Sequence, residues 1–292
     1  MDPLSFAIAL FVLGLLIGSF LNVVVHRLPI MMEREWRSDC ASLLEAEAPE
    51  DTDSERFDLI VPRSRCPKCN HAIAAWDNVP VLSYMFLRGK CRGCKTKISV
   101  RYPLVELVSG VFAGLSAWHF GSVDGAVSSS TILHAIAVAV FSWYLVALAL
   151  IDLDTQLLPD SLTMPLLWFG IALGLSDFHP LALEDAVLGA MFGYLSLWSV
   201  YWAFKLVTGK EGMGYGDFKL LAALGAWLGW QALPALILVS SVVGAVIGIT
   251  MVASAFIKRS EPIPFGPYLA LAGIIVMFWG EKLSGLFGQG AI

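Results

Sequence analysis

The chain has 292 residues, of which 57% are hydrophobic and only 15% are charged, and its formal net charge is −5. Soluble domains carry about 25% charged residues, so this composition excludes an ordinary soluble globular protein. The mild negative charge, with basic and acidic residues interleaved, also excludes a nucleic-acid-binding surface. We therefore expect an all-α polytopic protein whose main partner is the lipid bilayer.

Eight apolar runs follow one another along the chain and predict about eight transmembrane helices. A helix needs about 17–25 residues to cross the hydrocarbon layer of a bilayer. The first, third, fifth and seventh runs are long enough, whereas the fourth and sixth are short. The runs cover residues 4–25, 104–120, 132–151, 162–175, 186–204, 220–230, 232–257 and 265–280.

Charged residues gather in one polar insert, which holds 24 of the 43 Lys, Arg, Asp and Glu residues between positions 26 and 103. This pattern predicts three parts. Residues 1–25 form the first transmembrane helix, and residues 26–103 form a small insert. Residues 104–292 form a membrane domain of seven helices.

The distribution of Lys and Arg predicts the orientation in the membrane. The first apolar run is preceded by Met1, Asp2 and Pro3 and followed by Arg27, which is typical of a spanning helix and not of a cleaved signal peptide. In the eight-span arrangement, all basic residues except Lys282 fall on the side of the insert. Because basic loops stay in the cytoplasm, the insert is expected to be cytoplasmic and both termini are expected to lie on the outer side of the membrane.

Four of the five cysteines form two C-x2-C pairs, Cys66 with Cys69 and Cys91 with Cys94. Two such pairs are typical of a tetrahedral Zn²⁺ site with four thiolate ligands, and iron in the same cage is the alternative. Disulfides are rare in the cytoplasm. Since a small insert gains stability from a bound metal, a structural role is expected. The fifth cysteine, Cys40, is expected to be unpaired.

Two aspartates lie at the predicted cytoplasmic ends of apolar runs. Asp152 ends the third run, and Asp217 introduces the sixth. Two carboxylates at the same membrane depth could share a proton, as in aspartic proteases. Gly214 and Gly216 form a G-x-G-D motif with Asp217, and glycines there can adopt positive φ and admit a peptide or helix backbone close to the carboxylate.

Other polar residues are given structural roles. Asp160 is expected to cap the fourth helix, and Asp154 points about 200° away from Asp152 on a continuing helix. Glu106 is expected to snorkel or to pair with Arg101. Four isolated histidines show no spacing typical of a metal site, and they are His26, His119, His134 and His179.

These motifs together resemble the bacterial type IV prepilin peptidases, which are bifunctional leader peptidases and N-methyltransferases. The resemblance covers nearly the whole chain, in the family's order. It rests on residues 18–29, the four paired cysteines, and residues 101–106, 152–160 and 212–221.

The resemblance implies an intramembrane aspartyl protease of the G-x-G-D type in the bacterial inner membrane. Its catalytic pair would be Asp152 and Asp217, since the family's first aspartate stands seven residues before a proline, here Pro159. Its substrates would be prepilins and type II secretion pseudopilins, whose short basic leader is removed at the cytoplasmic face. The new N-terminal residue, usually Phe, would then be methylated from S-adenosylmethionine.

Three other interpretations remain open from the residues alone. A proton-coupled transporter could use the same two aspartates, although the ionisable groups of a transporter are expected nearer the middle of the bilayer. A peptidase without methyltransferase activity and a non-enzymatic zinc-ribbon scaffold are the others. The insert has no glycine-rich Rossmann fingerprint, so the residues that would bind S-adenosylmethionine stay unknown.

Overall fold

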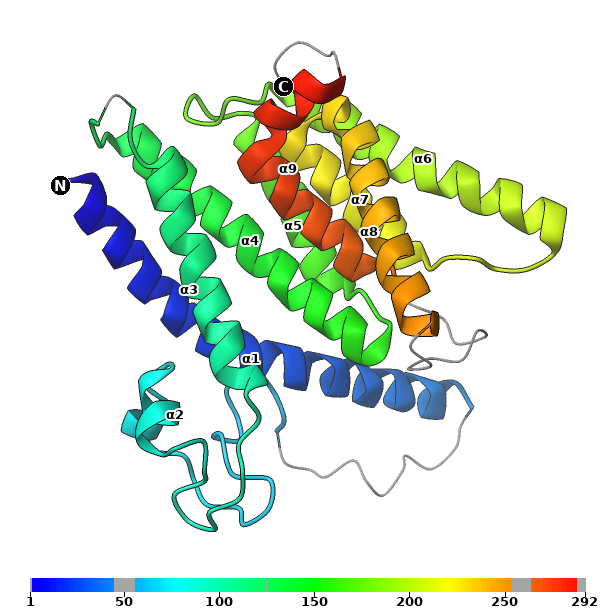
Figure 1. The fold of residues 1–292 in the computed structure, drawn as a ribbon. Coiled ribbons are helices and arrows are strands. Elements are labelled where there is room, and N and C mark those ends of the chain that lie inside the picture. The colour runs from blue at the N-terminus through cyan, green and yellow to red at the C-terminus, as the bar shows by residue number, and fades with distance from the viewer. Residues whose placement is uncertain (1, 45–55, 124, 254–263, 288–292) are drawn as a thin grey trace. The chain divides into compact units, whose positions relative to one another are not determined.

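The computed structural model describes residues 2–44, 56–123, 125–253 and 264–287, which are mainly helical with three isolated β-bridges (Figure 1). Two short 3-10 helices, Ala75–Asn78 and Trp230–Ala232, accompany the α-helices of these residues. The α-helices are α1 (Pro3–Leu43), α2 (Leu82–Phe86), α3 (Arg101–Phe120), α4 (Ser129–Thr155), α5 (Asp160–Leu173), α6 (Leu183–Thr208), α7 (Tyr215–Leu228), α8 (Leu233–Ala253) and α9 (Gly266–Phe287).

Each of the eight predicted apolar runs overlaps one long helix, namely α1 or one of α3 to α9. Two apolar segments are shorter than a full span, namely Asp160–Leu173 in α5 and Gly266–Gly280 in α9. The predicted fold class, an all-α polytopic membrane protein, is confirmed. Among the residues that the structure describes, five segments are long and apolar enough to cross a bilayer: Pro3–Leu43, Arg101–Phe120, Ser129–Thr155, Leu183–Thr208 and Trp230–Met251.

The chain folds as two compact units, Met1–Trp118 and His119–Ile292. The first unit contains α1, α2, α3 and the cysteine-bearing insert. The second contains α4 to α9, and both predicted catalytic aspartates lie within it. Each unit can therefore be described by itself.

In the first unit, small residues bring α1 and α3 into close contact. A Cβ atom built on Gly14 would lie 2.6 Å from the Ser109 carbonyl oxygen, and one built on Gly18 would lie 2.6 Å from the Glu106 Cα atom. Glycines at such crossings let the backbones of membrane helices approach each other. Any side chain at either position would push α1 and α3 apart.

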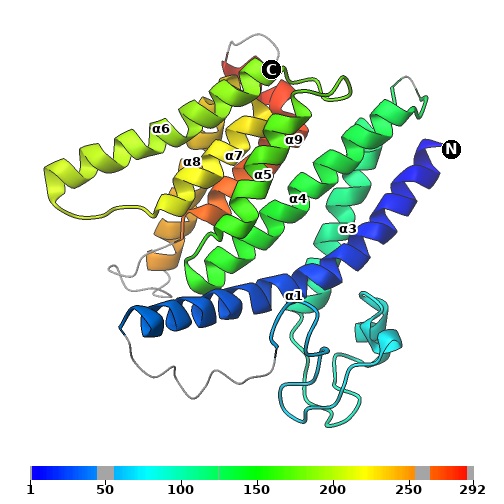
Figure 2. The same cartoon turned by 180° about the vertical axis from the view of Figure 1, so that it is seen from behind.

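The first helix was predicted to end with its apolar run at Val25, but it continues to Leu43. Its second half is polar and is supported by an i,i+4 ion pair between Arg37 and Glu33 at 2.6 Å. Pro29 lies inside the helix, and the ribbon of α1 changes direction part-way along its length in Figures 1 and 2. The end of an apolar run thus marks where the chain leaves the membrane, not where the helix stops.

In the second unit, α7 is the central helix. It packs against α5, α6 and α9, and Figure 2 shows these helices side by side. Gly189 of α6 and Gly225 of α7 meet backbone to backbone, and neither has room for a Cβ atom. The indole of Trp227 donates a hydrogen bond of 2.8 Å to the Leu166 carbonyl of α5. Close packing on several sides explains why a helix of 14 residues is almost wholly buried.

Candidate active site and metal centre

Asp152 lies in the last turn of α4 and is only 5% exposed. The helix ends three residues later, because Gln156 takes a left-handed conformation with φ of 56° and donates its N–H to the Asp152 carbonyl. The neighbouring Asp154 is exposed, as expected from its rotation about the helix. Asp152 is therefore the aspartate of this segment that faces the protein interior.

Asp217 lies in the first turn of α7 and is 8% exposed. Gly214 is the N-cap residue of this helix, and a carboxylate in a first turn is stabilised by the helix dipole. The next residue, Phe218, packs edge-on against Tyr201 and Tyr194 of α6. These ring contacts hold the start of α7 against α6.

The two aspartates belong to one cluster, and their carboxylates are close enough to interact electrostatically. Leu158, from the loop after α4, packs into this cluster. A Cβ atom on Gly216 would lie 2.8 Å from the Leu158 Cβ atom, and one on Gly266 would lie 3.2 Å from the Leu158 Cδ1 atom. Asp152 and Asp217, which are 65 positions apart, thus lie in one buried cluster.

Gly266, the first residue of α9, is a member of the site that the sequence reasoning missed. Its N–H donates a hydrogen bond of 3.0 Å to Asp152 Oδ2. The first N–H groups of a helix lack intrahelical partners, so this donor is available for the carboxylate. A Cβ atom at Gly266 would lie only 2.5 Å from the same oxygen. The position of Gly266 between Pro264 and Pro267 was the one feature of the sequence that could have drawn attention to this residue.

The two glycines of the G-x-G-D motif differ from the expectation. Neither Gly214 nor Gly216 has a positive φ, so their conformational freedom is not what the fold uses. Gly216 is required because Leu158 fills the space of its missing side chain. Gly214 has ordinary room around it, with its nearest neighbour, Asp217 Oδ2, at 3.8 Å from a built Cβ atom.

The prediction that Asp160 caps α5 is wrong, because Pro159 occupies the N-cap position. Asp160 is instead the first residue of the helix, and both of its carboxylate oxygens accept hydrogen bonds of 2.7 Å from Lys219 Nζ. Lys219 stands two residues after Asp217. The ion pair therefore joins the beginnings of α5 and α7 beside the cluster.

The loop that leads to the G-x-G-D motif is tied to the end of α6. Lys205 Nζ donates hydrogen bonds to Glu211 Oε1 at 2.8 Å and to the Tyr201 hydroxyl at 3.1 Å. The hydrogen bond from Lys205 holds the pKa of the Glu211 carboxyl below its usual value. The contact orders the loop six residues before Asp217.

The four paired cysteines come together in the first unit, as predicted. Their sulfur atoms all lie within 4.8 Å of one another. Each pair sits in a tight turn that closes with the N–H of the residue after the second cysteine, Asn70 or Lys95, donating to the carbonyl of the first cysteine. Both residues have positive φ, 55° and 60°. The two halves of the cluster are thus the same local fold used twice.

The spacing of the sulfur atoms fits a tetrahedral metal ion and not a disulfide. The Cys66 and Cys94 sulfurs are 3.8 Å apart, and those of Cys69 and Cys91 are 3.9 Å apart. Zinc–sulfur bonds of about 2.3 Å at tetrahedral angles separate the sulfurs by about 3.8 Å, whereas bonded sulfurs are about 2.05 Å apart. Cys40 is free and exposed, as expected.

Comparison with known proteins agrees with this geometry. The model of the bacterial peptidase A24 N-terminal domain matches residues 12–120, and that of the type IV leader peptidase family matches residues 139–249. A protein from Stutzerimonas stutzeri named prepilin leader peptidase/N-methyltransferase is 54% identical over 288 residues, which cover 99% of this chain and 96% of that protein.

The chain belongs to the type IV leader peptidase family. Proteins with the same name from Aeromonas salmonicida and Pseudomonas aeruginosa support this. The Aeromonas salmonicida protein is 55% identical, and the match covers 94% of this chain and 91% of that protein. The Pseudomonas aeruginosa protein is 52% identical, and the match covers 98% of this chain and 95% of that protein. No solved structure matches the chain.

Glu106 and a pair of histidines are polar groups that lie away from the aspartate cluster of this leader peptidase. The Glu106 carboxylate of α3 accepts the backbone N–H of Val81 at 2.8 Å. Two of the supposedly isolated histidines form a pair, since His134 Nδ1 and His179 Nδ1 lie 3.4 Å apart. Neither feature touches the two aspartates in the described contacts, so we give them structural roles.

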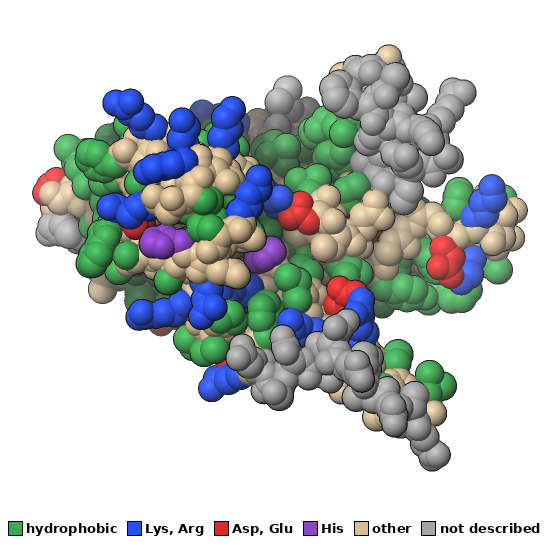
Figure 3. All heavy atoms as spheres, turned by 90° about the horizontal axis from the view of Figure 1, so that it is seen from below, with side chains coloured by type: hydrophobic (Ala, Val, Ile, Leu, Met, Phe, Trp, Pro, Cys, Tyr) green, Lys and Arg blue, Asp and Glu red, His purple; other side chains and the backbone are tan. Residues whose placement is uncertain are grey.

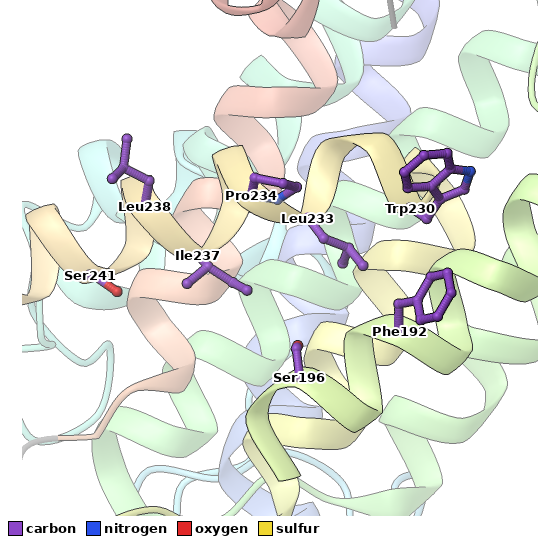
Figure 4. Close-up of a pocket in the computed structure, with 8 residues that line it drawn as sticks. All are labelled: Phe192, Ser196, Trp230, Leu233, Pro234, Ile237, Leu238 and Ser241. Carbon is purple, nitrogen blue, oxygen red and sulfur yellow. The ribbon is translucent and has the colours of Figure 1, made fainter. Parts of the chain in front are cut away.

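An open groove lies between α6 and α8 of this leader peptidase, and it does not contain the aspartates. Figure 4 shows its side chains, which are apolar apart from two serines, and none of them is titratable. An apolar groove on a membrane helix pair is expected to face lipid. It is lined by Phe192, Ser196, Trp230, Leu233, Pro234, Ile237, Leu238 and Ser241.

Proposed function

We propose that this protein cleaves the leader peptide from prepilins and pseudopilins with the Asp152 and Asp217 carboxylates, and then methylates the new N-terminal amine. The observation that carries the proposal is the meeting of two buried carboxylates from the ends of α4 and α7. The relatives are named for both activities, and they give no support to a transporter or to a scaffold without activity.

The peptide bond would be hydrolysed by the pair acting as base and acid. The ionised carboxylate takes a proton from water, whose oxygen bonds to the scissile carbonyl carbon. The protonated partner gives its proton to the carbonyl oxygen. When the intermediate collapses, the C–N bond breaks, the leaving amine takes the proton held by the first carboxylate, and the partner takes a proton back from one of the two hydroxyls on the former carbonyl carbon. The Gly266 N–H holds Asp152 in place during these transfers.

We also propose that the insert and the active site are cytoplasmic and that both termini are periplasmic in the inner membrane. The support is the excess of Lys and Arg on the insert side. The exposed Cys40 offers a test. A membrane-impermeant maleimide should label it only after permeabilisation of spheroplasts, and the Cys40→Ser variant controls for the other cysteines. Labelling of intact spheroplasts would reverse the orientation.

The proposed metal of the cysteine cluster is Zn²⁺, held by Cys66, Cys69, Cys91 and Cys94. The sulfur spacing supports it, and four thiolates leave no open position, so the ion would close the fold of the insert and take no part in chemistry. S-adenosylmethionine is proposed as the methyl donor because the relatives are named N-methyltransferases. No residues are assigned to it.

The decisive experiment mixes the purified protein with a prepilin and separates the products by mass. Asp152→Asn and Asp217→Asn should each lower leader cleavage by about 10³-fold or more, in the range of general acid–base effects. Asp154→Asn is the matched control, since Asp154 is exposed and two residues from Asp152. Normal cleavage by either active-site variant would refute the mechanism. Both variants should still methylate a pilin supplied without its leader.

A further inference from the structure

The insert contains one apolar stretch, residues 79–87, that the proposed activities leave without a role. It forms the short helix α2, and its large side chains point outward. Phe86 is 84% exposed, Met85 66% and Leu82 53%. Large apolar side chains that are exposed together mark an interaction surface. Something other than water is expected to cover α2.

The depth of α2 relative to the membrane follows from one hydrogen bond. Val81, the residue before α2, donates its N–H to the Glu106 carboxylate at 2.8 Å. Glu106 lies five residues into α3, which is a membrane-spanning helix, and a rise of about 1.5 Å per residue places it about 7.5 Å along the helix axis. Val81 is therefore held level with the first turns of a membrane span.

An exposed apolar surface of α3 begins at the same level. Tyr102, Leu104 and Leu107 in the first turns of α3 are all exposed. A second anchor holds the insert to α1, where the buried Arg27 donates hydrogen bonds to the carbonyls of Asp58 and Pro62. The insert is thus attached to both helices, to α1 through Arg27 and to the first turns of α3 through Glu106.

Charge indicates which lipids would be met there. Residues 56–101 contain ten Lys and Arg but only two acidic residues, Asp58 and Asp77. Two of the basic residues, Arg88 and Lys90, follow α2 directly. Figure 3 shows Lys and Arg gathered on the face of the insert. Basic groups beside an interfacial apolar segment are attracted to anionic lipid headgroups.

We propose that α2 is a membrane-interface element whose exposed side chains lie among the headgroups and upper acyl chains of the leaflet next to the insert, in contact with anionic phospholipid. A protein partner fits less well, because five residues offer far less than the roughly 800 Å² that each side of a stable protein interface buries. This inference rests on α3 being a membrane helix and not on the proposed catalysis.

The test places the photoreactive amino acid p-benzoylphenylalanine at position 86 or 85 of the full-length protein in vesicles of phosphatidylethanolamine and phosphatidylglycerol. After irradiation, mass spectrometry should find phospholipid adducts at least tenfold more often than with the same group at Ala72, an exposed position beyond the first cysteine turn. Metal content and leader cleavage report that each variant is folded. Equal yields at positions 86, 85 and 72 would overturn the proposal.

Crosslinks to a protein would show that α2 contacts something other than lipid, and they would also overturn the proposal. Protein dimers would indicate a second copy of the chain, and adducts formed only when prepilin is added would indicate the substrate. The anionic preference has its own test. Adducts should contain phosphatidylglycerol at least twofold above its share in the vesicle, and Arg88→Gln with Lys90→Gln should remove this enrichment. Enrichment that survives the double substitution would refute the role of these two charges.

Discussion

The hydrogen bond from Gly266 to Asp152 makes a sharp prediction for the Gly266→Ala substitution. The added Cβ atom would lie 2.5 Å from Asp152 Oδ2, whereas real Cβ contacts are almost never shorter than 3.0 Å. The carboxylate must therefore move by at least about 0.5 Å, and the bond from the Gly266 N–H must lengthen or break. The substitution acts directly on the geometry of the proposed catalytic pair.

The magnitude follows from two independent considerations. A hydrogen bond to a charged group contributes about 1.5–3 kcal/mol, which corresponds to about 10-fold to 150-fold in rate. A misplacement of a reacting group by about 1 Å costs about 100-fold. We therefore expect leader cleavage, measured as kcat/KM with a purified prepilin, to fall by about 100-fold in Gly266→Ala.

Two substitutions in the same helix serve as matched controls. At Gly280 the nearest atom to a new Cβ is Val276 Cγ1 at 3.5 Å, so Gly280→Ala should change neither stability nor activity. At Gly273 a new Cβ would lie 2.6 Å from Leu224 Cδ2, so Gly273→Ala should cost about 1–3 kcal/mol of stability through overpacking while leaving activity within a few-fold of wild type. Wild-type cleavage by a folded Gly266→Ala protein would refute the reasoning.

Three further predictions concern the metal, an ion pair and helix packing. Cys66→Ser combined with Cys69→Ser should abolish metal binding and make the insert protease-sensitive while the spans stay inserted; full zinc by elemental analysis would contradict the ligand set. Lys219→Asp should slow cleavage by tenfold or less, since an exposed ion pair contributes at most about 1 kcal/mol, and the swap with Asp160→Lys should restore the rate. Gly189→Ala should lower the melting temperature in detergent strongly, because its Cβ would overlap the Gly225 backbone; an unchanged melting temperature would contradict the packing.

The sequence predicted the parts of the structure that depend on local patterns. Apolar runs located the helices, and the C-x2-C pairs located the sulfur cluster, because both signals lie within a few residues. Asp152 and Asp217 were found because a carboxylate beside an apolar run is costly unless it is used. Their meeting required only that both helix ends lie on the same side of the membrane.

What the sequence could not show depends on contacts between distant segments. Gly266 reaches Asp152 across 114 residues, and no local pattern states which N–H will face a carboxylate. Asp160 appeared to be a capping residue because Lys219, its partner, lies 59 positions away. Gly216 appeared to need unusual backbone angles, whereas the structure shows that Leu158 needs its space.

The division of the chain into two units has a consequence for how the protein can change over generations. All residues placed at the aspartate cluster lie in His119–Ile292, and the sulfur cluster lies wholly in Met1–Trp118. Mutations in one unit can therefore disturb one cluster and leave the atoms of the other untouched. Selection can act on the proposed metal site and on the proposed catalytic pair as two separate traits.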